Sequence, residues 1–216
     1  MNKAEILKRI HDDWLIMIMR GDTEEETETT CEDLIAGGAT LIEVPFTTPG
    51  ASRIIRNLRG RHGDRIVVAA GTVTTVEQAE EAVANRAQAI VSPCLHAPVV
   101  EFAVRRGVVS SPGCVTPTEI ADALRLGADL IKLFPCYNVG PEYIGFILGP
   151  LPGTRIVPAG RVTLENMAAY HAAGAFAGVV GVTTEMGLLQ AVKSKYHDEV
   201  TRTARVFVDK VRSLFR

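Results

Sequence analysis

The chain has 216 residues, 47% of them hydrophobic, and a formal net charge of -2. This length and apolar content suffice for one substantial core, so we expect a single domain spanning 1–216. Neither a basic block nor a basic amphipathic arm stands out. That argues against nucleic acid or an anionic membrane as a partner, and leaves small molecules and further copies of the chain.

The N-terminal stretch and the cysteines indicate the compartment. Residues 1–14, MNKAEILKRIHDDW, scatter charges through their apolar positions, unlike a secretory signal. No apolar run approaches the roughly 20 residues that a membrane span needs. Four cysteines stand at irregular spacings, which suits reduced thiols better than a disulfide framework: Cys31, Cys94, Cys114 and Cys136. We therefore expect a cytoplasmic protein.

Short β-branched apolar runs recur along the chain and alternate with helical segments. We predict eight strands, at 14–19, 40–46, 65–72, 88–93, 107–113, 129–135, 154–160 and 176–181. No glycine-rich dinucleotide fingerprint follows the first strand. The strict alternation therefore favours a closed parallel (β/α)8 TIM barrel over an open doubly wound sheet.

The segments between the strands carry helix signals. In 74–86, Val76, Ala79 and Val83 share one predicted face. Thr116, followed by Pro-Thr-Glu, and Thr163, followed by Leu-Glu-Asn, predict helix starts. The end of the chain, 198–216, repeats apolar residues at helical spacing, which predicts a terminal helix packed on the barrel or on a neighbouring subunit.

In such a barrel the active site lies at the C-terminal ends of the strands. Polar residues fall at or near six of these predicted ends: Arg20, Glu43, Thr72, Ser92, Ser111 and Lys132. Gly160 and Gly181 follow the seventh and eighth strands, where barrel enzymes often bind a phosphate on backbone N–H groups.

Lys132 lies within the apolar run 128–140, ADLIKLFPCYNVG. Apolar neighbours disfavour the ammonium form, so more free amine is available to attack a carbonyl. Glu43, inside LIEVPF, would face the same cavity and move protons on an intermediate. The alternative is a buried Glu43–Lys132 ion pair that only fixes the barrel interior.

Other polar residues near the strand ends have two interpretations each. Arg20 can clamp a carboxylate or phosphate, or it can be a loop arginine bonded to Asp22 or Glu24. Thr47 and Thr72 can donate hydrogen bonds to an oxyanion. The three cysteines that follow strands, with His96 near Cys94, lack the close-pair spacing of structural zinc sites, so we expect small buried thiols and no metal.

Several motifs together resemble the class I aldolases that cleave 2-keto-3-deoxy-6-phosphogluconate, its galactonate epimer and 4-hydroxy-2-oxoglutarate. They are IMRGDT, LIEVPFTTPGA, AAGTVTTVEQ, IVSPCL, SPGCVTPTE, DLIKLFP, VGPEYI and VPAGRVTLENM. The resemblance implies cleavage to pyruvate and an aldehyde, such as glyceraldehyde 3-phosphate or glyoxylate, through a lysine Schiff base. It also implies a homotrimer that needs no metal or organic cofactor.

The resemblance assigns roles to single positions. It makes Lys132 the Schiff-base lysine and Glu43 the general acid/base, acting directly or through a water. Arg20 and Thr72 become ligands of the keto-acid carboxylate, and Gly160 with the loop after Gly181 becomes the phosphate-binding end. Among the matched motifs, Pro93 and Phe134 are also expected to contact the substrate.

Three positions depart from the family pattern. Thr47 stands where some members carry arginine, Arg161 where a second glycine is usual after strand seven, and Val182 where serine usually follows Gly181. The last two fall on the phosphate site. Our hypothesis is that the protein keeps retro-aldol chemistry but prefers a different group at the distal end of the substrate. Arg161 would hold a phosphate differently or hold a distal carboxylate.

Two rival functions are a phosphate-binding barrel isomerase or synthase, in which Lys132 pairs with an anion and never becomes covalent, and an aldolase homologue without activity.

Overall fold

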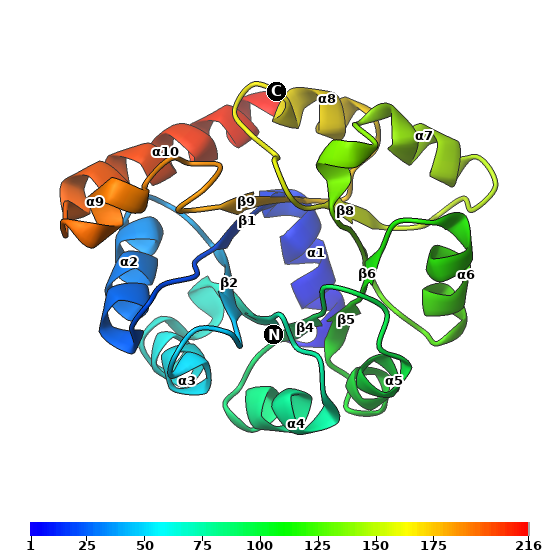
Figure 1. Ribbon diagram of the computed structural model, residues 1–216, viewed down its shortest axis with the longest axis horizontal. Helices are drawn as coiled ribbons and strands as arrows, with labels where there is room; N and C mark the ends of the chain where they lie inside the picture. Colours follow the sequence, from blue (N-terminus) through cyan, green and yellow to red (C-terminus); the bar gives the residue numbers. More distant parts are fainter. Residues whose placement is uncertain (216) are drawn as a thin grey trace.

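The protein is a barrel of parallel strands surrounded by helices, as Figure 1 shows in the computed structural model, which describes residues 1–215. The strands are β1 (Leu15–Ile18), β2 (Leu41–Pro45), β3 (Val67–Gly71), β4 (Ala89–Val91), β5 (Val109–Ser111), β6 (Gly113–Cys114), β7 (Ile131–Leu133), β8 (Ile156–Pro158) and β9 (Gly178–Gly181). All the predicted strands are present, and the fifth is divided into β5 and β6 at Pro112 because proline has no N–H for the ladder.

The strands close into a ring. One sheet has the order β5-β4-β3-β2-β1-β9 and the other β6-β7-β8. The two sheets are joined at one side by the continuous chain through Pro112 and at the other by a parallel bridge between Ala159 and Val179. This closure, with every pair parallel, confirms the predicted (β/α)8 barrel.

Helices cover the outside of the barrel. They are α2 (Glu24–Ala36), α3 (Ala51–His62), α4 (Val76–Ala84), α5 (Ala97–Arg105), α6 (Pro117–Arg125), α7 (Glu142–Leu148), α8 (Met167–Ala172), α9 (Leu189–Lys193) and α10 (His197–Leu214). A capping box formed by Thr116 and Glu119 starts α6 as predicted. Thr75 caps α4, which buries Ala79 against the barrel.

One helix starts about one turn later than predicted. Residues 164–166 form a turn, and α8 begins at Met167. The side-chain amide of Asn166 accepts from the N–H of Thr163, as in a capping box, and donates to the carbonyl of Arg161, at 2.7 and 2.8 Å. The N–H of Met167 donates to the carbonyl of Thr163 at 3.0 Å, so the predicted start at Thr163 opens a single turn that leads into α8.

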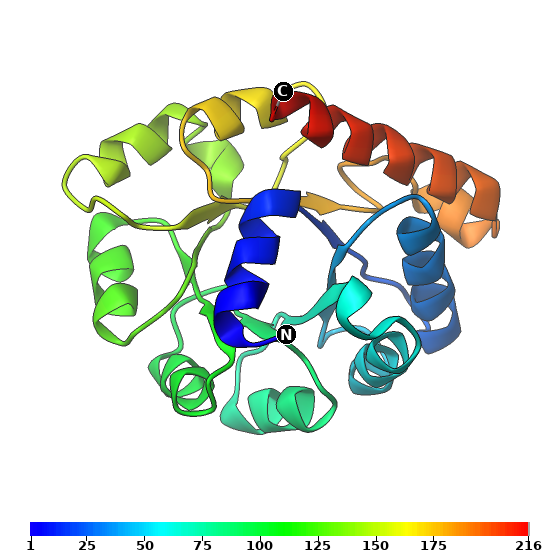
Figure 2. The same ribbon diagram turned by 180° about the vertical axis from the view of Figure 1, so that it is seen from behind.

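The two terminal helices pack on different parts of the barrel. Helix α1 (Lys3–Asp13) crosses the N-terminal mouth of the barrel, as Figure 2 shows, and its Ile6 and Ile10 join the apolar residues of the barrel interior. Helix α10 packs against α2, α8 and α9 on the outside, which agrees with the predicted terminal helix; Arg216 lies outside the described residues.

None of the helices in residues 1–215 combines the length and the apolar character that crossing a membrane requires.

Candidate active site

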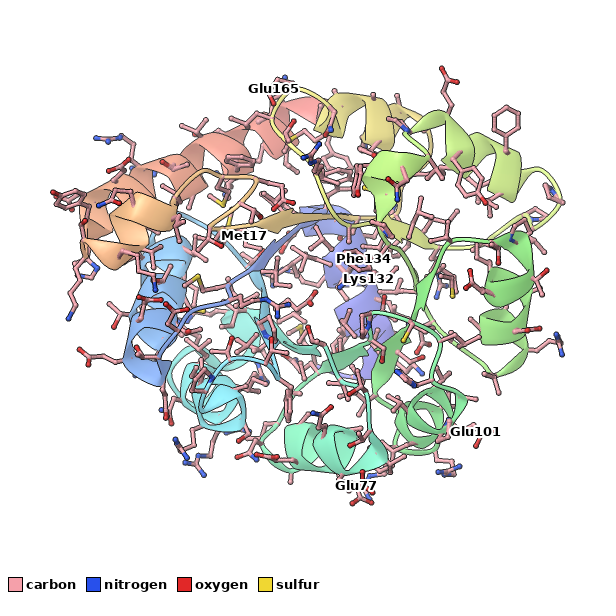
Figure 3. All side chains as sticks on the ribbon, in the orientation of Figure 1. Met17, Glu77, Glu101, Lys132, Phe134 and Glu165 are labelled. Atoms are coloured by element: carbon pink, nitrogen blue, oxygen red, sulfur yellow. The ribbon has the colours of Figure 1, made fainter. Side chains whose placement is uncertain are left out.

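Lys132 and Glu43 meet inside the barrel. Lys132 is the central residue of β7 and Glu43 the central residue of β2, and the alternation of side chains along each strand turns both inward. Figure 3 places Lys132 near the barrel axis. Its Nζ lies 3.6 Å from Oε1 of Glu43, with the two side chains only 8% and 1% exposed. The sequence prediction that they share a cavity is met by this geometry.

The space around Glu43 leaves one of its carboxylate oxygens without a hydrogen bond. Oε1 of Glu43 is buried and has no hydrogen-bond partner among the described residues. Gly71, paired with Pro45 on the neighbouring strand, provides the room, because a Cβ at this position would overlap Oε1 of Glu43. Because Oε1 lies within ion-pair distance of Lys132 and makes no hydrogen bond, the contact fits both interpretations of the sequence, the catalytic pair and the structural ion pair.

Lys132 stands between two spaces. Towards the N-terminal end of the barrel, an apolar cavity of about 20 Å³ adjoins Lys132 and Glu43. Towards the C-terminal end, a cavity of about 190 Å³ opens at the ends of β1, β7, β8 and β9; we call it the rim cavity. Lys132, Arg20 and Phe134 line it from the ends of β1 and β7, and Gly160, Gly181 and Glu185 line it from the ends of β8 and β9, which we call its far end.

Arg20 follows β1 and joins the loops after β2 and β3. Its guanidinium donates to the hydroxyl of Thr47 and, at 3.3 Å, to that of Thr72. It does not take the loop contacts of the alternative interpretation, because Asp22 pairs with Lys193 and Glu24 with Arg53. Two hydroxyls thus orient the guanidinium at the rim cavity.

Thr72 adopts a conformation that a β-branched residue rarely takes. Its φ is +54°, in the left-handed region. Such strain persists where the surrounding structure imposes it, and it is concentrated at functional positions. Here it accompanies the hydrogen bond from Arg20.

Phe134 and Pro93 differ in their placement. Phe134 is 38% exposed and lines the rim cavity, and its ring centroid lies 5.3 Å from Nζ of Lys132. Pro93 follows β4, and its carbonyl occupies the place where a Cβ of Gly113 would lie. The structure thus brings Phe134 to the rim cavity, while Pro93 is not among the residues that line it.

Two of the three departures from the family pattern, Arg161 and Val182, have side chains that do not line the rim cavity. The guanidinium of Arg161 lies over the ring of Tyr137, 5.1 Å from its centroid, and does not line the cavity. Val182 is fully buried, and its N–H donates to the carbonyl of Ile18 at 3.0 Å. Neither side chain is placed to hold the distal end of a ligand.

Glu185, which the sequence analysis did not single out, occupies that end. Its carboxylate accepts from the backbone N–H of Arg161 and of Gly181, both at 2.9 Å, and from the hydroxyl of Thr184. The only sequence signal was an acidic residue in the loop after the last strand. Where that loop folds back cannot be read from the residue order.

The cysteines that follow strands do not converge, and the expectation of buried thiols is wrong for Cys94, which is exposed. Cys94 lies 3.1 Å from Nε2 of His96, whereas the thiol of Cys136 donates to the carbonyl of Gly160 at 2.8 Å. Burial raises the pKa of the Cys114 thiol to about 12. Within residues 1–215, no group of three or more His, Cys, Asp and Glu side chains is arranged to hold a metal.

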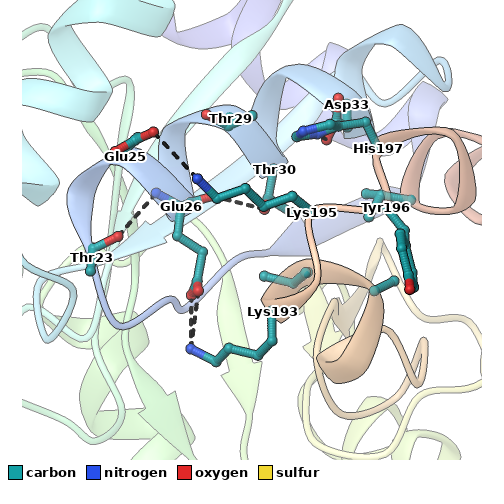
Figure 4. A pocket seen from close by; sticks show the side chains of 13 residues that line it. Thr23, Glu25, Glu26, Thr29, Thr30, Asp33, Lys193, Lys195, Tyr196 and His197 are labelled. Atoms are coloured by element: carbon teal, nitrogen blue, oxygen red, sulfur yellow. Dashed lines mark hydrogen bonds and ion pairs between the residues drawn. The ribbon is translucent and has the colours of Figure 1, made fainter.

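A larger cavity, of about 380 Å³, lies outside the barrel between α2 and the segment that joins α9 to α10. Figure 4 shows that its charged side chains pair with one another. Lys193 contacts Glu26, Lys195 contacts Glu25, and His197 contacts Asp33. These contacts satisfy its charges internally, so the rim cavity is the better candidate.

Comparison with known proteins gives consistent matches. The family model described as "Aldolase: KDPG and KHG aldolase" matches residues 6–203. The 2-dehydro-3-deoxy-6-phosphogalactonate aldolase of Escherichia coli K12 is 37% identical over 161 residues, 74% of this chain and 78% of its own. The 2-dehydro-3-deoxy-phosphogluconate aldolase of Treponema pallidum is 35% identical, covering 78% and 79%. A solved structure named "Native KDPGal structure" superposes with a TM-score of 0.82 at 33% identity, over 93% and 95% of the two chains.

Proposed function

The chain belongs to the KDPG and KHG aldolase family and is thus an aldolase, a lyase, and from this membership we propose that it cleaves a 2-keto-3-deoxy sugar acid to pyruvate and an aldehyde through an imine on Lys132. The observation that carries the proposal is the buried Lys132 amine, 3.6 Å from the Glu43 carboxylate, at the floor of the rim cavity.

The first half of the reaction uses Lys132 as the nucleophile. Its neutral amine adds to the C2 carbonyl of the substrate and forms a carbinolamine. Glu43 then protonates the departing hydroxyl, directly or through a water, and a protonated imine remains.

In the second half, the imine accepts electrons. When Glu43, or a water that it holds, takes the proton of the C4 hydroxyl, the C3–C4 bond breaks, the aldehyde leaves, and the bonding electrons pass into an enamine on Lys132. Glu43, or a water that it holds, protonates C3. Hydrolysis of the resulting imine releases pyruvate and restores the amine.

Arg20 would hold the substrate carboxylate during these steps. Its guanidinium lines the same cavity as Lys132, and the hydroxyls of Thr47 and Thr72 fix its direction. A carboxylate bound there by two parallel hydrogen bonds keeps C2 near the amine.

Trapping with borohydride tests the imine. Pyruvate and borohydride are added to the protein, and intact mass followed by peptide mapping locates any reduced adduct. We expect one adduct, on Lys132, and none in Lys132→Met. No adduct in a folded wild-type protein would contradict the proposal and favour an isomerase, a synthase or an inactive homologue.

We also propose that the protein works as a homotrimer in the cytoplasm, as the family resemblance implies. Exposed aromatic side chains support self-association: Phe146 on α7 is 74% exposed, and Tyr137 just before α7 is 55% exposed. Light scattering on the eluted protein should give three times the mass of one chain, and a Phe146→Asp variant should lower it. A monomer would contradict the trimer.

A further inference from the structure

The far end of the rim cavity holds the backbone donors expected for an anion. The N–H of Arg161 follows β8 and the N–H of Gly181 ends β9, which is where barrel enzymes frequently bind phosphate. In this protein both N–H groups donate to the carboxylate of Glu185, one to each oxygen, at 2.9 Å. The chain's own side chain therefore takes the position of the external anion.

The surrounding residues are shaped for this carboxylate. A Cβ at Gly181 would overlap Oε2 of Glu185 and the hydroxyl of Thr184, so a larger residue there would displace both side chains from their present positions. Thr184 adds a hydroxyl donor to the same oxygen. Three hydrogen bonds and the space left by Gly181 together define a specific position for this carboxylate.

No cation among the described residues neutralises the charge of the Glu185 carboxylate in this position. All three donors are uncharged groups, and no lysine, arginine or histidine in residues 1–215 forms an ion pair with Glu185. A phosphate, which carries about -1.5 to -2 charges at pH 7, would meet both a negative charge and donors already in use. The distal carboxylate of 4-hydroxy-2-oxoglutarate would meet the same repulsion.

We propose that Glu185 is a specificity-determining residue that selects substrates with an uncharged distal end, namely unphosphorylated 2-keto-3-deoxy sugar acids, whose terminal hydroxyl donates to its carboxylate. Glu185 and Lys132 line one cavity, so a substrate held as an imine at one end reaches the carboxylate at the other. This inference rests on the proposed aldolase function and adds the substrate class.

The wild-type protein provides the first test. kcat/KM is measured for cleavage of 2-keto-3-deoxygluconate and 2-keto-3-deoxygalactonate and of their 6-phosphates. We expect the unphosphorylated acids to be preferred by at least about 10-fold, because like charges brought together strongly disfavour the wrong ligand. Equal values, or a preference for the phosphates, would overturn the inference.

Variants provide the second test. Glu185→Ser removes the carboxylate and leaves the two N–H groups open, and Glu185→Gln removes the charge with little change in size. Both should raise the ratio of kcat/KM for the 6-phosphates to that for the free acids at least about 10-fold. Thermal unfolding checks that each variant folds. An unchanged ratio in two folded variants would overturn the inference.

Glu165→Gln is the matched control. Glu165 is an exposed carboxylate in the neighbouring 161–166 loop and does not line the rim cavity. Its removal changes the net charge equally, so a similar change in ratio would attribute the effect to general electrostatics and overturn the role of Glu185. The pyruvate adduct separates the two proposals: an adduct together with phosphate preference refutes only the specificity, whereas no adduct refutes both.

Discussion

The inner end of the site, at Glu43 and Lys132 inside the barrel, and its outer end, at Glu185 on the rim cavity, differ in whether their polar groups already have partners. At the inner end, Oε1 of Glu43 has no hydrogen-bond partner among the described residues and forms an ion pair with Lys132 at 3.6 Å. At the outer end, the N–H groups of Arg161 and Gly181 both donate to Glu185. A buried carboxylate oxygen that has an ion-pair partner but no hydrogen bond is costly to keep, and we interpret it as kept for a reaction. Donors that the chain itself satisfies are closed to an external anion.

Removing the amine should have the largest effect. Lys132→Met should lower kcat/KM by at least about 10³-fold, because no imine can form. It also leaves the Glu43 carboxylate buried without a cation, which should cost about 3–5 kcal/mol in the free energy of unfolding. A coupled assay of pyruvate release and urea unfolding measure both. Activity within 10-fold of wild type would contradict the role of Lys132.

Removing the proton-transfer group should have the next largest effect. Glu43→Gln keeps the size of the side chain and should lower kcat by about 10²–10⁴-fold. Lys132 remains, so the pyruvate adduct should still form, though slowly. The measurement is the rate of borohydride-trapped adduct compared with the rate of turnover. If both rates equalled those of wild type, Glu43 would be only a structural partner of Lys132.

Displacing Glu43 without removing it should have a smaller effect. In Gly71→Ala the new Cβ would overlap Oε1 of Glu43 and push the carboxylate away from its place. We expect kcat to fall roughly 10-fold to 10²-fold, since small misplacements of a reacting group are costly. The pH profile of kcat should change as well, which a loss of stability alone would not produce. Gly60→Ala, in α3 with open space around its Cα, is the control.

The sequence predicted the inner end better than the outer end, for a physical reason. Lys132 and Glu43 lie on strands, where alternation and burial fix the direction of a side chain, and both were identified from apolar runs. The barrel and its strand order followed from the same repetition. Local details differed, such as the regular part of α8, which begins at Met167, one turn after Thr163.

At the outer end the groups belong to loops, where no such rule holds. The sequence singles out Arg161 because a charge is unusual at that position of the family pattern. Its side chain, however, lies over the ring of Tyr137 and does not line the cavity. The sequence does not single out Glu185, although its carboxylate accepts from the two N–H groups that define that end. Which loop side chain folds back onto a backbone donor depends on tertiary contacts, so residue order alone could not reveal it.

The smallest effect is expected from Arg161 itself. Arg161→Gly removes a guanidinium that lies outside the rim cavity but keeps the backbone N–H that donates to Glu185. kcat/KM should therefore change by less than about 3-fold on phosphorylated and free acids alike. Stability should stay within about 1 kcal/mol, because the lost contact with Tyr137 is offset by glycine's ease at a φ of +65°. Comparing Arg161→Gly with Glu185→Ser on the same two substrates shows whether the ratio of kcat/KM depends on the Arg161 guanidinium or on the backbone N–H groups that donate to Glu185. If Arg161→Gly alone shifted the substrate ratio, the cation and not Glu185 would determine which distal end the cavity accepts.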